Sequence, residues 1–272
     1  MYSLSLYCTC SSTVHALTIS SDVTNETALK AVHQKICDTL PPIVGAMQGA
    51  MVLRDVSLRN MSFEELNDVI RPKVNGSIYL DRIFYNVNLD FFILISSINC
   101  VIGNMGQANY AAANTFMCSL AAQRRKRGLR AATVNAGAIV GAGYMERESR
   151  RALDVIVQKL HMMRMSEEDW TQAISEAIDA SRLESPHGPE ITTGLSDVPF
   201  DTPNAPNWFL NPKFSSFIVQ QGAATEDKNE GKASASVSER LQSCQSQQEV
   251  YTVVERKYYL PAVLTLYLYT LR

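Results

Sequence analysis

The chain has 272 residues, of which 46% are hydrophobic and 19% charged, and its formal net charge is −2. This much apolar material can bury a core, which excludes a globally disordered chain, and the small net charge gives no electrostatic basis for binding nucleic acid. The six cysteines and four histidines lack the spacing of metal ligands. We therefore expect no metal site, and reduced thiols in a cytoplasmic protein.

Strand and helix patterns alternate from residue 14 onward. Residues 14–19 and 43–47 are predicted to be short strands, and residues 26–40 between them have apolar side chains at helical spacing. Either Thr24 or Asn25 can cap this helix. A second helix, predicted from a capping box at Ser62 to about residue 85, contains Pro72, which predicts a kink.

The central predicted strand is the continuous apolar run FFILIS at residues 91–96. Such runs are typical of parallel strands that are covered on both faces. The elements predicted after it are a helix at 107–125 ended by Gly128, a strand at 131–134, and helices at 153–160 and 167–183, the last capped by Ser166. This alternation predicts an α/β fold with a Rossmann-like parallel sheet, in which residues 91–96 lie between 43–47 and 131–134.

Four polar residues around the central strand carry the strongest chemical signal. Ser97 follows the strand at its carboxyl end, where open α/β sheets bind ligands. Tyr110 and Asn114 lie one turn apart on the next helix, and Lys73 lies in the preceding helix. An ammonium near a phenol lowers the phenol's pKa and helps to carry protons. A serine hydroxyl can hold a carbonyl oxygen beside that phenol, so the set suits the reduction of a carbonyl group.

The stretch FFILISSINCVIGNMGQANYAAANTF resembles the active-site region of ketoreductase domains in polyketide synthases, which belong to the short-chain dehydrogenase/reductase superfamily. Ordinary members of that superfamily have Tyr-x-x-x-Lys, whereas this chain has Asn114 in the lysine position and the lysine displaced to Lys73. That exchange is typical of synthase ketoreductases. The resemblance implies that Tyr110 is the proton donor, Ser97 its partner, and Lys73 and Asn114 their supports.

The flanking sequences extend the resemblance to about residues 14–219, including NWFLNPKFSSFIV, which is similar to the domain end in fungal-type highly reducing synthases and synthase–peptide-synthetase hybrids. The implied cofactor is NADPH. Asp22 and Val23 resemble the pair that contacts its adenine end. Gln48 and Gly49 fall in the loop below its nicotinamide.

One family feature has no counterpart in this sequence. A glycine-rich turn that seats the cofactor's pyrophosphate at a helix N-terminus should precede Asp22, but the first 21 residues contain no glycine. We therefore expect a sheet that lacks the family's first strands and this turn, in a chain truncated at its N-terminus.

The composition suggests four regions. We expect a non-native or disordered start at 1–13, a partial ketoreductase domain at 14–219, and a linker at 220–236, where large apolar residues are absent. Residues 237–272 begin like the first helix of an acyl carrier protein and end in an atypical tail. An apolar run in that tail is about a dozen residues long, short of the ~20 that a membrane span needs.

The resemblance implies NADPH-dependent reduction of a β-ketoacyl thioester to a β-hydroxyacyl thioester in polyketide biosynthesis. The expected partners are a substrate tethered to an acyl carrier protein and the other megasynthase domains, with no nucleic acid and no membrane. Because the nucleotide cradle is missing from the sequence, the alternative is a non-catalytic remnant or an interaction fragment of a megasynthase. For the same reason we expect impaired activity from this chain by itself.

Overall fold

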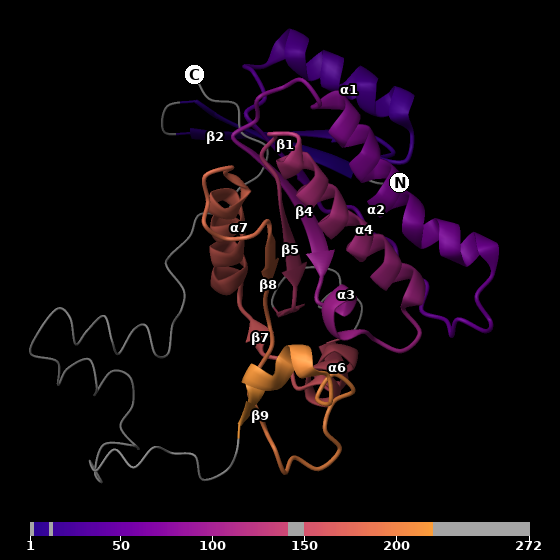
Figure 1. Ribbon diagram of the computed structural model, residues 1–272. Helices are drawn as coiled ribbons and strands as arrows, with labels where there is room; N and C mark the ends of the chain where they lie inside the picture. The colour runs from indigo at the N-terminus through magenta and orange to yellow at the C-terminus, as the bar shows by residue number, and fades with distance from the viewer. Residues whose placement is uncertain (1–2, 11–12, 141–149, 220–272) are drawn as a thin grey trace, which may run out of the picture.

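The computed structural model describes residues 3–10, 13–140 and 150–219. A four-stranded parallel sheet with the order β3-β4-β5-β8 forms its centre (Figure 1). Its strands are β3 (Gly45–Gln48), β4 (Phe91–Ser97), β5 (Ala132–Ala136) and β8 (Glu190–Thr192). The sheet confirms the predicted parallel α/β fold, in which the FFILIS strand lies between the strands predicted at 43–47 and 131–134.

Helices cover both faces of this sheet. On one face lie α1 (Glu26–Thr39), α2 (Phe63–Ile83) and α4 (Ala108–Lys126), and α7 (Glu167–Ser181) lies on the other (Figure 1). Phe92 and Leu94 of β4 pack with the α4 side, whereas Phe91 and Ile93 pack with α7. All four are buried, which explains why this part of the strand is apolar at consecutive positions rather than at alternate ones.

Several helices begin or end at the capping residues that the sequence predicted. Asn25 caps α1 through its side chain, and both Ser62 and Ser166 form reciprocal capping boxes at α2 and α7. Gly128 follows α4 with a φ of +76°, a left-handed conformation that favours glycine. Local capping therefore fixes where these helices meet the sheet.

The first two strands stand outside the parallel sheet. β1 (Ser3–Cys10) and β2 (Thr13–Ser20) pair with each other in an antiparallel register, Ser3 opposite Ser20. The strand predicted at 14–19 is thus present as β2. The strand β1 was not predicted, since residues 1–13 were assigned to a non-native or disordered start. Local pairing needs only a short connection, so its loop-closure entropy is small.

A smaller unit lies beyond the carboxyl end of the sheet. Trp208 is buried at its centre, packs edge-on against Phe214, and donates from Nε1 to the carbonyl oxygen of Leu160 at 2.9 Å. The elements there are α3 (Asn99–Ile102), β6 (Ala138–Ile139), α6 (Arg150–Leu160), β7 (Arg164–Met165), β9 (Val198–Pro199), the 3-10 helix η1 (Pro212–Phe217) and β10 (Ile218–Val219). The predicted linker and carrier-protein-like region, 220–272, lie outside the described residues.

The arginines at the end of α4 bond to neighbouring elements of the protein. Arg124 is 1% exposed, stacks over the Phe92 ring at 4.0 Å and pairs with Asp81 of α2. Arg127 donates to the same carboxylate oxygen at 2.7 Å. Arg125 donates to three backbone carbonyls between residues 180 and 187. These arginines therefore hold helices together and do not form an open basic surface.

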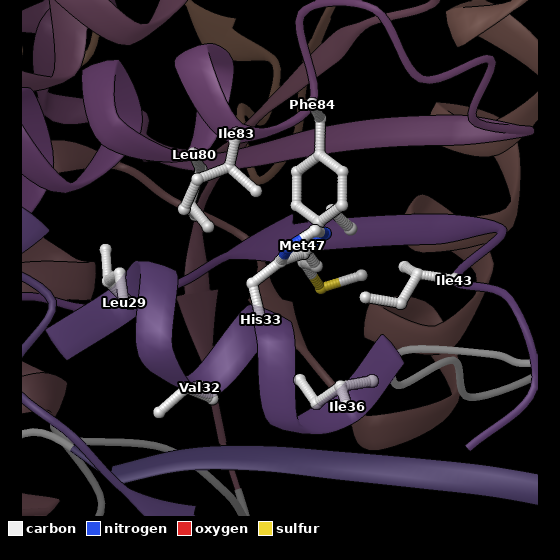
Figure 2. Close-up of a pocket in the computed structure, with 10 residues that line it drawn as sticks. Leu29, Val32, His33, Ile36, Ile43, Met47, Leu80, Ile83 and Phe84 are labelled. Atoms are coloured by element: carbon white, nitrogen blue, oxygen red, sulfur yellow. The ribbon is translucent and has the colours of Figure 1, made fainter. Parts of the chain in front are cut away.

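A small apolar cavity of about 40 Å³ lies between α1, α2 and β3. Figure 2 shows the side chains that line it. His33 projects into it from α1 and meets the Phe84 ring edge-on, at 5.4 Å between ring centroids. Burial lowers the pKa of His33, which keeps it neutral at pH 7. The lining is apolar and lies on the helix side of β3, so we treat this cavity as a packing feature.

Candidate active site

The four predicted chemical residues come from three elements around the carboxyl half of β4. Lys73 lies in the middle of α2, Ser97 ends β4, and Tyr110 and Asn114 occupy the first turns of α4. The helices α2 and α4 pack side by side along this strand, as Figure 1 shows. Elements far apart in the sequence therefore bring these side chains to one end of the sheet.

Lys73 is a buried lysine, 1% exposed. Its Nζ donates to the carbonyl oxygen of Ile95 at 2.8 Å and lies 5.3 Å from the centroid of the Tyr110 ring. Burial lowers its pKa to about 7, while negative charge at the neighbouring Cys100 acts in the opposite direction. The side-chain amine can therefore gain a proton, and the ammonium can lose one, near neutral pH.

Tyr110 is also buried, and its hydroxyl contacts the Met51 sulfur at 3.8 Å. Burial raises the pKa of the phenol, and the polar side chains of Asn114 and Ser97 act in the opposite direction. The phenol consequently keeps its proton at pH 7, as a proton donor must.

Asn114 and Ser97 complete the cluster. The fully buried Asn114 donates from Nδ2 to the carbonyl oxygen of Tyr110 at 2.7 Å. Its Oδ1 has no hydrogen-bond partner among the described residues, so it can accept one more hydrogen bond. The Ser97 Oγ accepts from the backbone N–H of Asn99 at 3.3 Å, which leaves the hydroxyl proton able to donate.

The loop after β3 lies next to Tyr110. The backbone N–H of Val56 donates to Gly106 at 2.8 Å, Gln107 Nε2 donates to Asp55 at 2.8 Å, and Asn109 Nδ2 donates to Arg54 at 3.1 Å. These bonds hold the segment after β3 against the start of α4. No sequence pattern indicated them, because each is a single contact between distant residues.

The residues predicted to touch the cofactor fit that role unequally. The buried Gln48 uses both ends of its amide within the protein, donating to Pro72 at 2.7 Å and accepting from Ala50 at 2.6 Å. Val23 is buried against Gly76 of α2, which leaves only its backbone for a ligand.

The other two predicted contacts are accessible. Gly49 is exposed at the carboxyl end of β3, and a Cβ placed there would meet nothing nearer than Ile95 at 3.8 Å. Asp22 is exposed and accepts from the backbone N–H and the hydroxyl of Thr24, both at 2.8 Å. These residues fit the two ends of a dinucleotide. None of the described turns that lead from a strand into a helix has the glycine-rich sequence that would hold the pyrophosphate between them.

The sheet order and the Ser-Tyr-Lys cluster at its carboxyl end define a Rossmann-like fold of the short-chain dehydrogenase/reductase type. Comparison with known proteins narrows this class. Residues 6–141 match the family model of the KR domain. The chain belongs to the ketoreductase domain family of polyketide synthases, which uses a nicotinamide cofactor.

Curated relatives are fungal synthases. The chain is 60% identical over 242 residues to the highly reducing polyketide synthase calA of Penicillium decumbens, covering 88% of this chain and 8% of calA. It is 57% identical over 237 residues to the highly reducing polyketide synthase bet1 of Neocamarosporium betae, and the match covers 87% of this chain and 8% of bet1. The hybrid PKS-NRPS synthetase poxE of Penicillium oxalicum is 41% identical, with 87% and 6% covered. The chain thus spans under a tenth of these multidomain relatives.

Solved ketoreductases share the fold. PlmKR1, from the first module of phoslactomycin biosynthesis in Streptomyces sp. HK803, superposes with a TM-score of 0.58 at 28% identity, covering 65% of this chain and 39% of PlmKR1. An A-type ketoreductase from a modular polyketide synthase superposes with a TM-score of 0.58 at 25% identity. This match covers 66% of this chain and 36% of that ketoreductase. Among the residues that the structure describes, no helix combines the length and hydropathy that a membrane crossing requires.

Proposed function

We propose that this chain supplies the reaction centre for NADPH-dependent reduction of a β-ketoacyl thioester to a β-hydroxyacyl thioester. The observation that carries the proposal is the position of Lys73, whose buried ammonium lies 5.3 Å from the centre of the Tyr110 ring. Burying a lysine beside a tyrosine costs folding free energy, because the charged form loses its hydration. Groups whose pKa is shifted in this way cluster at functional sites.

In this proposal Tyr110 gives its hydroxyl proton to the carbonyl oxygen of the substrate. Ser97 donates a hydrogen bond to that oxygen, holding it beside the phenol as negative charge develops. The Lys73 ammonium stabilises the phenolate that remains and helps to return a proton to it. Asn114 fixes the first turn of α4 through its bond to the Tyr110 carbonyl, and its free Oδ1 can join the proton path.

When bound, the nicotinamide would supply the hydride for the carbonyl carbon. Gly49 suits its nicotinamide end, because the glycine is exposed and open to close approach of a ligand. Asp22 and the backbone of Val23 suit the adenine end. Gln48 acts differently, since its amide joins the end of β3 to the carbonyl of Pro72 and so positions Lys73 next to it.

The proposed substrate is tethered to an acyl carrier protein, and the proposed partners are the other domains of a megasynthase. The names of the relatives support this proposal, because they are highly reducing synthases and synthase–peptide-synthetase hybrids. A carrier-bound thioester would bring the ketone to the carboxyl edge of the sheet, where Ser97 and Tyr110 lie.

The test replaces Tyr110 by phenylalanine in the complete synthase polypeptide and follows NADPH absorbance with a β-ketoacyl thioester. Loss of the general acid should lower turnover by about 10²- to 10⁴-fold and leave NADPH affinity unchanged. Tyr85→Phe is the matched control, since Tyr85 is 49% exposed beyond the end of α2. Turnover that survives in the Tyr110 variant would remove Tyr110 from the acid role.

A further inference from the structure

Two cysteine sulfurs meet beside the candidate active site. Cys100 lies on the short helix α3 and Cys118 on α4, and their sulfurs lie 3.4 Å and 3.3 Å from the same side-chain oxygen of Asn135. The same sulfurs lie 3.5 Å and 3.9 Å from the hydroxyl oxygen of Ser96. Because they share both hydrogen-bond partners, Ser96 and Asn135, the two thiols are neighbours.

The two thiols differ in acidity in the way that a reactive pair requires. Interaction with the Cys118 thiol is the largest of the effects that lower the pKa of Cys100, to about 7. The same interaction, together with burial, raises the pKa of Cys118. Near neutral pH Cys100 is therefore the thiol that ionises to the nucleophilic thiolate, while Cys118 keeps its proton.

Small reagents can reach the two thiols, and the two sulfurs can approach one another. Both cysteines are only partly buried, and neither is locked within a disulfide. A disulfide needs its sulfurs about 2.05 Å apart, so the thiols must approach one another. Helix α3 has four residues and is followed by Gly103 at a φ of +76°, so a small shift of this single turn can bring Cys100 toward Cys118.

We propose that Cys100 and Cys118 are a modification site that peroxide converts into a reversible disulfide. The Cys100 thiolate attacks one oxygen of a hydroperoxide, giving a sulfenic acid and, from hydrogen peroxide, hydroxide that takes a proton from solvent. The Cys118 thiol then attacks the sulfenic sulfur, and its proton leaves with the hydroxyl group as water. The two sulfurs lose two electrons and the peroxide gains them.

This bond would act on the proposed reaction centre, a consequence that rests on the proposed function. Negative charge at Cys100 raises the pKa of both Lys73 and Tyr110. The disulfide is neutral, so oxidation removes that charge, favours loss of the Lys73 proton, and ties α3 to the helix that carries Tyr110. Oxidation should therefore slow reduction, and dithiothreitol should restore it.

The disulfide is tested by mass, independently of any reductase assay. The folded chain is treated with hydrogen peroxide, its free thiols are alkylated, and it is digested without reduction. Trypsin leaves both cysteines in one peptide, residues 83–124, which should lose about 2 Da and resist alkylation. Chymotrypsin cuts between them, after Tyr110 and Phe116, so the two halves should stay joined until dithiothreitol is added.

Three variants separate this pair from the other thiols. Cys118→Ser should trap Cys100 as a sulfenic acid that dimedone labels, and Cys100→Ser should leave Cys118 open to alkylation. Cys37→Ser is the control, because Cys37 is exposed on α1, away from this cluster, and its loss should not affect the bond. Alkylation of both cysteines in the oxidised wild-type chain, or pairing of either with another cysteine, would overturn the proposal whether or not the variants fold.

Discussion

Lys73 donates from its buried Nζ to the carbonyl oxygen of Ile95 at 2.8 Å and lies 5.3 Å from the centroid of the Tyr110 ring. The lysine is held there by helix α2 and has no carboxylate partner among the described residues. Its charged form is therefore paired mainly with dipoles and with the thiolate of Cys100. Such a group should reveal itself in the pH dependence of stability.

Lys73→Met should remove a pH-dependent part of the free energy of unfolding. Burial lowers the folded-state pKa of Lys73 to about 7 from the ordinary 10.5, so between these values the unfolded chain binds a proton that the native chain lacks. Stability therefore rises with pH through this window, by up to about 1.4 kcal/mol per pH unit. Denaturant unfolding at pH 7, 8 and 9 should show this rise in the wild type and a flatter dependence in the variant.

The difference between the two chains is the informative quantity. Cys100 titrates in the same range, but it is present in each chain, so most of its contribution cancels. Burial raises the pKa of Tyr110, and this residue too is present in both chains. Parallel stability curves for wild type and Lys73→Met would show that the native lysine keeps its ordinary pKa.

Asp81→Asn should destabilise the fold by about 3–5 kcal/mol. The substitution leaves the guanidinium of Arg124 buried without a counter-charge, and breaking one side of a buried ion pair has this effect. Asp68→Asn is the matched control, because its pair with Arg54 is exposed, at 42% and 51%, and should change stability by less than about 1 kcal/mol. Equal losses in the two variants, measured by urea unfolding, would contradict the assignment of a buried pair.

Gly76→Ala should be destabilising although it lies within a helix. Alanine is intrinsically better than glycine in α2 by about 1 kcal/mol. A Cβ at this position would lie 2.7 Å from Val23 Cγ2 and 3.1 Å from Gln48 Nε2, and overpacking of this kind costs about 1–3 kcal/mol. Gly49→Ala should leave the thermal midpoint unchanged, because its nearest neighbour is 3.8 Å away. A more stable Gly76→Ala chain would show that Val23 and Gln48 can move away from the added Cβ at little cost in free energy.

The central sheet was predictable where the local pattern was strong. Five consecutive apolar residues at 91–95 indicated a covered strand, and the polar caps at Thr24 or Asn25, Ser62 and Ser166 marked three helix starts. β8 escaped prediction because it has three residues, EIT, at the edge of the sheet. So short a polar strand is defined by its pairing with β5 and not by its own sequence.

The candidate site likewise contains some contacts that the sequence predicts and others that it does not. Tyr110 and Asn114 are one turn apart on a single helix, so their proximity follows from helical spacing. The inward-facing role of Gln48 depends on the carbonyl of Pro72, and the pairing of Cys100 with Cys118 depends on how α3 meets α4. Contacts of this kind arise from tertiary packing, which spacing along the chain does not reveal.

The last prediction concerns the 272-residue chain by itself, and it decides between the reductase and the alternative of a non-catalytic or interaction fragment. We expect it to consume little NADPH in the presence of a β-ketoacyl thioester. The residues proposed to contact the cofactor, from Asp22 to Gly49, reach only its two ends, and no described strand-to-helix turn has the glycine-rich sequence that would hold a pyrophosphate. The complete synthase should turn over under the same conditions, and Tyr110→Phe should stop it. Tyr110-dependent turnover by the isolated chain at the rate of the complete synthase would show that other residues of this chain hold the phosphates.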